Sequence, residues 1–162
     1  MRDHIAIVHH VVHGFAHGSD RDDLLQEVSL ALWRAAAAFR GDCSESTFIY
    51  RVAHNAALTW LRSERQHRRR VEVAIEIEWM THPLEGRSRS ATPDRLAQLY
   101  AAIRTLAPID RSLVLLSLDG LSYREIASVH GLSESNIGAR LTRARQRLAE
   151  RLTEHHETNF PS

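Results

Sequence analysis

The sequence predicts an all-α protein made of two small helical domains joined by a flexible linker. Apolar residues recur at helical spacing through most of the 162 residues. The 7 glycines and 4 prolines are few and scattered, which disfavours a turn-rich β architecture. The helical pattern breaks over residues 71–92, so we expect a linker there, between domains at 1–70 and 93–155 and ahead of a tail at 156–162.

The composition is that of a globular chain whose charges are unevenly distributed. A hydrophobic fraction of 43% can supply a core, which excludes wholesale disorder. The formal net charge is only +1, so the total charge does not indicate a nucleic-acid partner. The charges are nevertheless segregated, with acidic residues around 20–27 and the basic run "RSERQHRRR" at 62–70. Such segregation creates local fields that the net charge hides.

The single cysteine, Cys43, excludes an internal disulfide and fits a reducing cytosol. No apolar run is long enough to cross a bilayer, and the histidine-interrupted N-terminus lacks a signal-peptide core. We therefore expect a soluble, cytoplasmic protein with no membrane insertion and no cofactor.

The first two helices are predicted at about residues 4–17 and 20–39. Ser19 is a candidate N-cap for the second helix, and three aspartates follow in its first turn, where carboxylates suit the helix dipole. One side of the second helix carries apolar residues such as Leu24, and the opposite side carries Leu30 and Trp33. A helix that is apolar on two sides is either sandwiched in the fold or docks a partner.

The third helix is predicted at about residues 47–66, after a cap at Ser44 or Ser46. One face is apolar and suits the core, with Ile49, Val52, Ala53, Ala56 and Trp60. The other face is a polar row rich in hydrogen-bond donors, with Thr47, Arg51, His54, Asn55, Leu58 and Arg62. A solvated helix face is the plain alternative for this row.

After this helix, "VEVAIEIEW" alternates apolar and polar residues with the period of a strand. No second segment offers pairing, so we expect an extended linker. Helices return at Pro93, a good first helical residue. Two apolar seams follow, the first with Leu96, Leu99, Tyr100, Ile103 and Leu106, and the second with Ile109, Leu113, Leu116 and Leu118.

The stretch "LSYREIASVHGLSESNIGARLTRARQRL" predicts a helix-turn-helix. Ser122 and Glu125 have the spacing of a capping box, and Gly131 suits the left-handed conformation that ends a helix. Ser133 caps the second helix. Two hydrophobic staples, Leu121 with Ile126 and Leu132 with Ile137, set the entry angles of both helices.

The second helix of this motif has an apolar seam and an outward polar face. The seam contains Ile137, Leu141, Ala144, Leu148 and Leu152. Ser135, Asn136, Ala139 and Arg143 point away from it, and Arg140 lies along the flank. Arginine can pair with guanine and asparagine with adenine in the major groove. Arg124 and Arg145 are better placed to hold phosphates.

Together, "DLLQEVSLALWRA", "STFIYRVAHNAALTWLR" and the helix-turn-helix resemble a bacterial RNA polymerase sigma factor of the extracytoplasmic-function (ECF) type. The resemblance covers nearly the whole chain, with the motifs in the family's order. It implies that 1–70 is region two and 93–155 is region four. It also implies a non-enzymatic protein that binds core RNA polymerase and directs promoter-specific transcription initiation, with a linker threading near the polymerase active-site or RNA-exit channel.

The resemblance implies a role for each surface. Core polymerase would be bound by Asp23, Gln26, Glu27, Leu30 and Trp33. The melted −10 element of promoter DNA would be held by Arg40, Phe48, Arg51, His54, Asn55 and Arg62. The −35 element would be recognised as duplex by Ser135, Asn136, Ala139, Arg140 and Arg143. An anti-sigma factor is a further expected partner.

The chain departs from the family pattern at three positions. Phe48 stands where the family usually has Trp, and His54 stands where Arg is common, so −10 specificity is expected to differ. Gly138 stands where a basic residue is frequent, and we interpret it as permitting close approach of DNA. We also expect neither the helix that commonly precedes region two nor an added C-terminal regulatory domain.

Two other functions compete with this one. A stand-alone helix-turn-helix transcriptional regulator would bind its operator unaided, but it would leave the two-sided second helix and the 47–62 face without partners. A metal site could form on His9, His13 and His17, which recur every four residues. No HExxH motif or carboxylate–histidine pair accompanies them, so we expect no metal.

Overall fold

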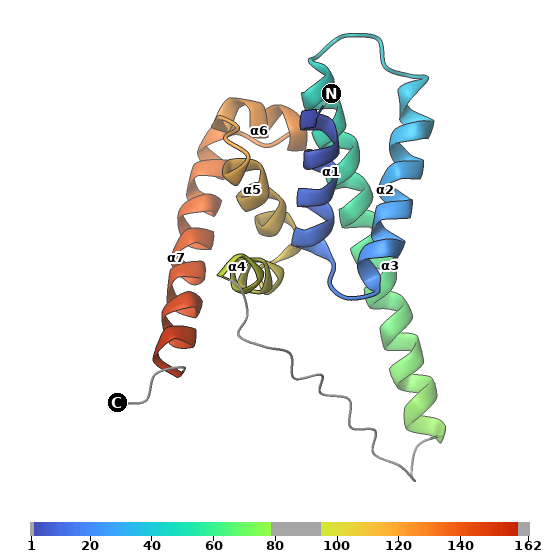
Figure 1. The fold of residues 1–162 in the computed structure, drawn as a ribbon, viewed down its shortest axis with the longest axis vertical. Helices are drawn as coiled ribbons and strands as arrows, with labels where there is room; N and C mark the ends of the chain where they lie inside the picture. Colours follow the sequence, from blue (N-terminus) through green and yellow to red (C-terminus); the bar gives the residue numbers. More distant parts are fainter. Residues whose placement is uncertain (1, 79–94, 159–162) are drawn as a thin grey trace.

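The computed structural model of the protein describes residues 2–78 and 95–158, and within them the chain is helical (Figure 1). The described residues form seven helices: α1 (Arg2–Phe15), α2 (Asp20–Ala36), α3 (Glu45–Glu78), α4 (Arg95–Arg104), α5 (Pro108–Leu118), α6 (Tyr123–His130) and α7 (Glu134–Thr158). Within the two described ranges there is no strand, and no helix is long and apolar enough to cross a membrane. The predicted all-α fold is confirmed.

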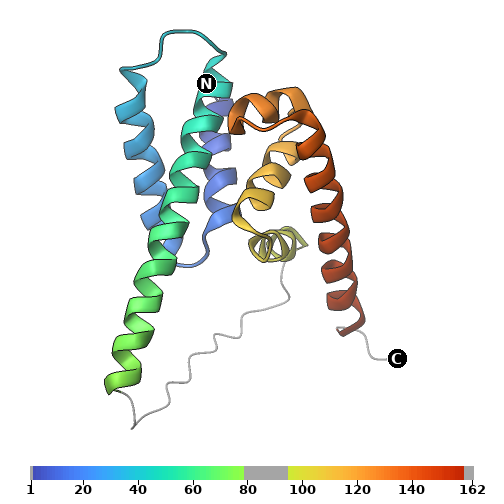
Figure 2. The same cartoon turned by 180° about the vertical axis from the view of Figure 1, so that it is seen from behind.

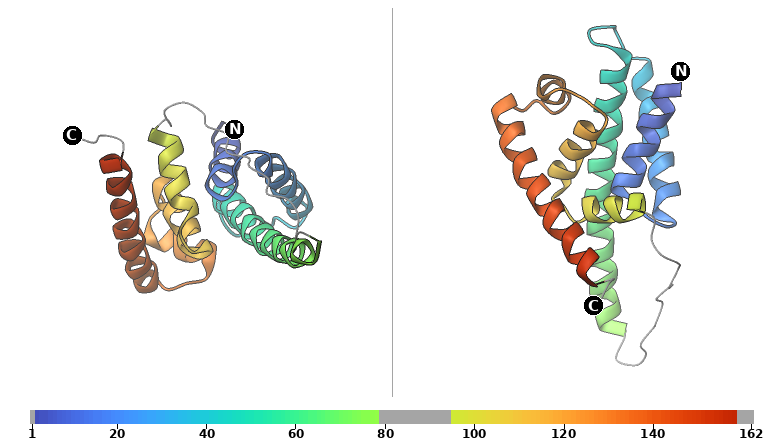
Figure 3. Two further views of the ribbon diagram at one scale, coloured as in Figure 1. Left: turned by 90° about the horizontal axis from the view of Figure 1, so that it is seen from below. Right: turned by 60° about the vertical axis from the view of Figure 1, so that its left-hand side comes forward.

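The helices form two groups that lie side by side. Helices α1, α2 and α3 pack together, and α5, α6 and α7 pack together with α4 crossing beneath them (Figures 1 and 2). Helix α1 contacts α4 and α5, and α3 contacts α5 and α6. Figure 3 shows α1 and α3 on the inner side of their group, with α2 on the outside. One continuous hydrophobic core therefore runs through both groups.

Helix α2 begins without the predicted side-chain cap. Ser19 itself has helical angles, φ −63° and ψ −28°, and its side chain makes no capping hydrogen bond. The turn before it is made by Gly18, whose positive φ of 56° favours glycine. Three aspartates still lie in the first turn, as the helix dipole favours. The helix ends at Ala36, three residues before the predicted end at Phe39.

Helix α3 begins as predicted and ends much later. The Ser44 hydroxyl accepts a hydrogen bond from the Thr47 backbone N–H at 3.1 Å, which confirms Ser44 as the cap. The helix then continues to Glu78, so the extended conformation predicted for residues 71–78 is wrong. The alternating segment has no second strand with which to pair. Continuing α3 adds one backbone hydrogen bond per residue, so the helical conformation is more stable than an unpaired extended one. The rest of the predicted linker, 79–92, and Pro93 lie outside the described residues.

The two predicted apolar seams that follow Pro93 are only partly buried. Ile103, Leu106, Leu113 and Leu116 are core residues, but Leu96 and Leu118 are 55% and 52% exposed. Both exceptions stand near a helix end, where the neighbouring helices no longer cover the side chain. Pro108 occupies the first turn of α5, where its missing N–H costs nothing.

The helix-turn-helix caps are confirmed. The Ser122 hydroxyl accepts from the Glu125 backbone N–H, and the Glu125 carboxylate accepts from the Ser122 backbone N–H at 2.7 Å. The Ser122 hydroxyl, which donates to the Glu125 carboxylate at 2.7 Å, and then the Ser122 backbone N–H hold the pKa of the Glu125 carboxyl below its usual range. Gly131 has φ 67° and ends α6, and Ser133 caps α7 through the Asn136 N–H at 3.3 Å.

Removing the capping box is expected to destabilise the second group of helices. Ser122→Ala leaves the Glu125 backbone N–H without its side-chain acceptor, which costs about 1 kcal/mol of unfolding free energy. Urea unfolding followed by circular dichroism measures this loss. Ser29→Ala, at an exposed position inside α2, is the matched control and is expected to cause no loss. Equal stability of Ser122→Ala and the unchanged chain would contradict the capping account.

Candidate nucleic-acid and polymerase interface

The outer face of α2 carries the residues predicted to bind polymerase. All five are solvent-exposed: Asp23, Gln26, Glu27, Leu30 and Trp33. Trp33 is 75% exposed, while Leu24 and Val28 on the opposite side of the helix are fully buried. The sequence therefore leaves a large indole in water on a helix that already has a packed side. Such an apolar patch ringed by acidic side chains indicates a surface that binds another macromolecule.

The loop between α2 and α3 carries an exposed arginine close in sequence to a pair of aromatic rings. Arg40 is exposed in this loop. The ring of Phe39, in the loop, lies against that of Phe48 at the start of α3, with centroids 4.7 Å apart and planes tilted by 44°. Aromatic rings beside a cationic group suit unstacked bases and their phosphates. The structure thus brings two residues of the predicted −10 set, Arg40 and Phe48, to one end of the first group.

The rest of the predicted −10 set does not share one open face. Asn55 and Arg62 are exposed, whereas His54 has no exposed surface and Arg51 is half-buried. The Arg51 guanidinium donates to the Ser128 carbonyl oxygen of α6 at 3.3 Å. The polar row of α3 is therefore covered at His54, because α5 and α6 pack against α3.

His54 belongs to a buried hydrogen-bonded cluster. Its Nδ1 lies 2.5 Å from the Ser112 hydroxyl of α5, and the same hydroxyl lies 2.8 Å from Nε2 of His130 in α6. Burial lowers the pKa of His54 to about 3 and that of His130 to about 4, and the positive charge that His130 would carry lowers the His54 pKa further. Both imidazoles are therefore neutral at neutral pH. One serine can donate to one ring and accept from the other.

This cluster predicts that the fold loses stability in mild acid. Both pKa values lie below the ordinary 6.5, so the unfolded chain binds more protons than the folded chain between about pH 6.5 and about pH 4. The free energy of unfolding is highest above about pH 6.5, where both rings are neutral in the folded and the unfolded chain. Below that pH it falls by about 1.4 kcal/mol per pH unit for each ring. Urea unfolding at about pH 7.5 and about pH 5.5 measures the difference. His130→Gln is expected to reduce the pH dependence, and an unchanged slope would contradict this account.

The second helix of the motif presents its predicted outward face to solvent. Ser135, Asn136, Ala139 and Arg143 are exposed, while Ile137 and Leu141 are fully buried and Leu148 is nearly so. The small side chains near the N-terminus of α7 leave room for the backbone to approach a DNA groove. The predicted division of α7 into a core seam and an outward face is therefore present in the structure.

The other arginines predicted to contact DNA from this group of helices differ in whether they already have an intramolecular partner. Arg140 Nε lies 2.9 Å from the Asp110 carboxylate, so its guanidinium already has an intramolecular partner. Arg145 donates to the Ser117 hydroxyl at 2.8 Å, and Arg124 is exposed. Gly138 is half-buried, and a Cβ there would lie 3.3 Å from the Tyr123 ring. Its absent side chain makes room for α6, which differs from the interpretation that it serves close approach of DNA.

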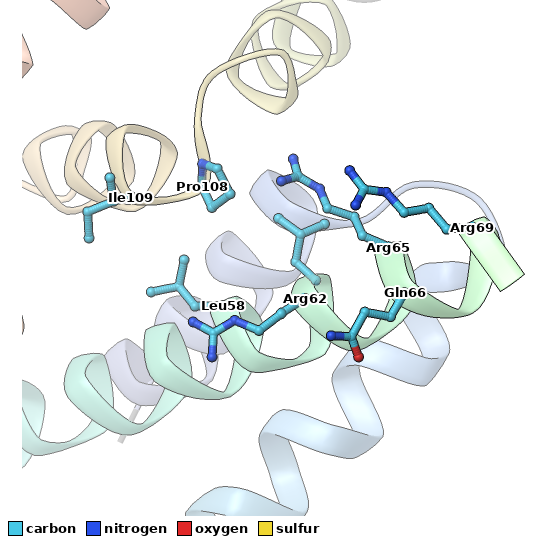
Figure 4. Close-up of a pocket in the computed structure, with 8 residues that line it drawn as sticks. Leu58, Arg62, Arg65, Gln66, Arg69, Pro108 and Ile109 are labelled. Atoms are coloured by element: carbon cyan, nitrogen blue, oxygen red, sulfur yellow. The ribbon is translucent and has the colours of Figure 1, made fainter.

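A groove between α3 and α5 joins Arg62 of the predicted −10 set to two basic residues without a predicted role, Arg65 and Arg69. Its volume is about 500 Å³ (Figure 4). Leu58, Leu61, Pro108 and Ile109 supply apolar walls, and Arg62, Arg65 and Arg69 line one side. The basic run at 62–70 was visible in the sequence, but its placement opposite Pro108 depends on how the two groups pack.

The candidate metal ligands His9, His13 and His17 lie on α1 and just beyond its end. His9 and His17 are exposed and His13 is half-buried, with its ring centroid 5.6 Å from that of Tyr100 and the two planes tilted by 49°. His10 instead pairs with the Asp119 carboxylate beyond α5. Among the described residues, no group of three or more histidine, cysteine or acidic side chains could hold a metal ion.

Two family models match the two groups of helices. Residues 1–67 match Sigma-70 region 2, and residues 96–148 match Sigma-70, region 4. The chain is 34% identical over 140 residues to the ECF RNA polymerase sigma factor SigM of Mycobacterium tuberculosis, covering 82% of this chain and 64% of that relative's length. It is 28% identical over 144 residues to the ECF RNA polymerase sigma-E factor of Escherichia coli K12, covering 84% of this chain and 75% of that one.

Solved structures show the same arrangement of helices. One neighbour is the sigma factor RpoE of Bartonella quintana, determined with the anti-sigma factor NepR, at a TM-score of 0.64, 19% identity, and coverage of 93% of this chain and 91% of that one. Another is CnrH, determined with the cytosolic domain of CnrY, at a TM-score of 0.61, 23% identity, and coverage of 94% and 84%. At these identities the likeness establishes the fold.

Proposed function

We propose that this chain, which belongs to the sigma-70 family of the ECF type, binds core RNA polymerase and directs promoter-specific initiation of transcription. Region two, 1–70, would dock on polymerase and hold the melted −10 element. Region four, 93–155, would recognise the −35 element in the major groove. The polymerase performs the chemistry, and this chain supplies specificity in the cytoplasm, where polymerase acts.

The observation that carries the proposal is the exposed stripe on α2. A stand-alone regulator would not require a 75% exposed tryptophan beside Leu30, because this helix lies outside the DNA-binding motif. A subunit that must dock on a large enzyme needs such an anchor, because exposed aromatic residues that become buried on binding dominate interface energies. The acidic side chains Asp23 and Glu27 beside it would add electrostatic complementarity to a basic partner surface.

The DNA contacts are proposed residue by residue. Arg40, Phe48, Asn55 and Arg62 would contact the melted −10 strand directly, and Arg51 and His54 would join them once region four has moved. Asn136 and Arg143 would contact base edges of the −35 element, with Ser135 and Ala139 allowing close approach and Arg140 leaving Asp110. Arg124 and Arg145 would hold phosphates.

The test separates this function from that of an operator-binding regulator. Binding of fluorescent duplexes from the source genome is measured with and without sigma-free core polymerase. The proposal expects weak binding by the free chain and tight, sequence-selective binding with core, because polymerase holds the two DNA-binding regions together and raises their effective concentration. Tight sequence-specific binding without core, together with no association with core on gel filtration, would favour the regulator.

An anti-sigma factor is the second proposed partner. The solved neighbours RpoE and CnrH were determined with NepR and CnrY respectively. In this chain the groove between α3 and α5, with its apolar walls and three arginines, would suit an acidic amphipathic segment (Figure 4). Co-purification of a partner that is lost on Arg65→Glu and Arg69→Glu would support this docking site.

A further inference from the structure

A cavity of about 230 Å³ lies beside the end of α1, and arginines from three other helices line it. The four arginines are Arg65 and Arg68 of α3, Arg104 at the end of α4 and Arg111 of α5. Apolar side chains, among them the ring of Phe15, complete its walls. So many cationic groups around a small space create a strong local positive field, which indicates a site for an anion.

Carboxylates neutralise this arginine cavity only in part. Arg68 donates to the Asp20 carboxylate at 2.6 Å and to the Glu64 carboxylate at 2.8 Å. Asp20 and Glu64 are the two acidic side chains of the lining, so four arginines face two carboxylates and two positive charges are unbalanced. Three arginines of the lining have no carboxylate partner among the described residues: Arg65, Arg104 and Arg111.

The guanidinium of Arg111 is a buried cation that the protein stabilises incompletely. The residue is 4% exposed. Its Nη2 donates to the carbonyl oxygens of Arg104 and Leu106, and its guanidinium carbon lies 5.3 Å from the centroid of the Phe15 ring. Within the described part of the chain, its buried Nε has no hydrogen-bond partner. Burial and then the charges of Arg65 and Arg104 lower the pKa of Arg111 to about 10.

Arg104 is in a similar position. Its guanidinium donates to the His13 carbonyl oxygen at 2.9 Å, and burial followed by the charge of Arg21 lowers its pKa. Both shifts mean that neighbouring positive charges destabilise these cations in the folded chain. A bound anion would reverse this effect, because it would replace repulsion between arginines by attraction to a common partner.

We propose that the arginine cavity binds a small phosphorylated molecule with at least two negative charges, held by Arg65, Arg104 and Arg111. A guanidinium presents paired N–H donors that match the oxygens of a phosphate group. A phosphate group also carries more charge and more acceptor oxygens than a carboxylate does. The volume suits a group of about the size of pyrophosphate. The site uses neither the α2 stripe nor the outward face of α7, so it does not depend on the proposed function.

Calorimetric titration of the full chain with pyrophosphate, at neutral pH and constant ionic strength, measures the binding. One site per chain is expected. Arg65→Gln and Arg104→Gln should each weaken the affinity about tenfold or more, because each removes a charge-assisted hydrogen bond. Arg69→Gln is the matched control. It makes the same change of charge on the same helix, but Arg69 lines the neighbouring groove and not the arginine cavity (Figure 4), so its affinity should stay within about twofold.

Thermal unfolding distinguishes a ligand site from a cluster that only supports the fold. Arg65 is exposed and has no hydrogen bond or ion pair among the described residues, and its charge disfavours the Arg111 cation. Without anion, Arg65→Gln should therefore melt at the same temperature as the unchanged chain or higher. Pyrophosphate should raise the melting temperature of the unchanged chain and of Arg69→Gln, but not that of Arg65→Gln, since a ligand of the folded state stabilises it.

Three results would contradict the proposed site. The first is no binding of pyrophosphate to the unchanged chain, or binding that all three variants weaken equally. The second is equal affinity for succinate, which would assign the cavity to carboxylates. The third is binding of single-stranded DNA that Arg65→Gln weakens while pyrophosphate does not bind, which would make the arginines a DNA contact. None of these measurements involves core polymerase, so failure of this site and failure of the proposed function are separate outcomes.

Discussion

Trp33→Ala is expected to weaken binding of the chain to core RNA polymerase by roughly thirtyfold or more, while leaving the fold intact. The indole is 75% exposed in the free chain, so its removal takes away almost no internal packing. In a complex it would be buried at the centre of the α2 stripe, where truncation of an anchor residue costs about 2 kcal/mol or more. Fluorescence anisotropy of the labelled chain, titrated with core enzyme, measures the change.

Ile5→Ala is the matched control for Trp33→Ala. It also truncates a large apolar side chain that is mostly exposed, 64%, but on α1. Its affinity for core polymerase should stay within about twofold of the unchanged chain, since it makes no proposed contact. Equal affinities for Trp33→Ala and Ile5→Ala would show that the α2 stripe is not the docking surface.

Arg143→Ala is expected to reduce promoter binding by the assembled enzyme about 5- to 150-fold, with the loss confined to particular bases of the −35 element. Arg143 is exposed on the outward face of α7, next to the small Ala139. An arginine that pairs with a guanine edge contributes about 1–3 kcal/mol of discrimination against the wrong base. Binding of the holoenzyme to promoter variants, each changed at one −35 position, measures the loss base by base.

Arg145→Ala is the comparison for Arg143→Ala. Its guanidinium is anchored to Ser117, in keeping with a phosphate contact. We expect a uniform loss across all promoter variants and a shallower dependence of affinity on salt. If Arg143→Ala also lowered binding uniformly, it would be a phosphate contact and not a base contact.

The helix-turn-helix could be predicted from the sequence nearly to the residue, because its determinants are local. A capping box joins residues three apart, and Gly131 satisfies a left-handed angle at a single position. The seam of α7 follows from helical periodicity alone. None of these features depends on where the rest of the chain lies.

The end of α3 could not be predicted from periodicity. The alternation over 71–78 has the period of a strand, but a strand is stable only beside another strand. A helix already formed by the preceding residues needs no such partner. The failed cap at Ser19 has a similar cause, because the preceding turn at Gly18 leaves Ser19 with helical angles instead of the extended ones that a cap needs.

The burial of His54 could not be foreseen, because its cover comes from far along the chain. Ser112 is 58 residues away and His130 is further still. The sequence correctly places His54 on the polar side of α3, but polarity does not distinguish a side chain facing solvent from one that faces a polar interface. The same holds for Gly14, where an added Cβ would meet the side chain of Leu115 on α5.

The central claim is that this chain turns core RNA polymerase into a promoter-specific enzyme. The direct measurement is transcription in vitro by sigma-free core enzyme on fragments of the source genome, with the 5′ ends of all transcripts sequenced. We expect the added chain to produce starts that share one pair of upstream elements, and Trp33→Ala to abolish them. Transcripts no different from those of core enzyme alone would contradict the claim.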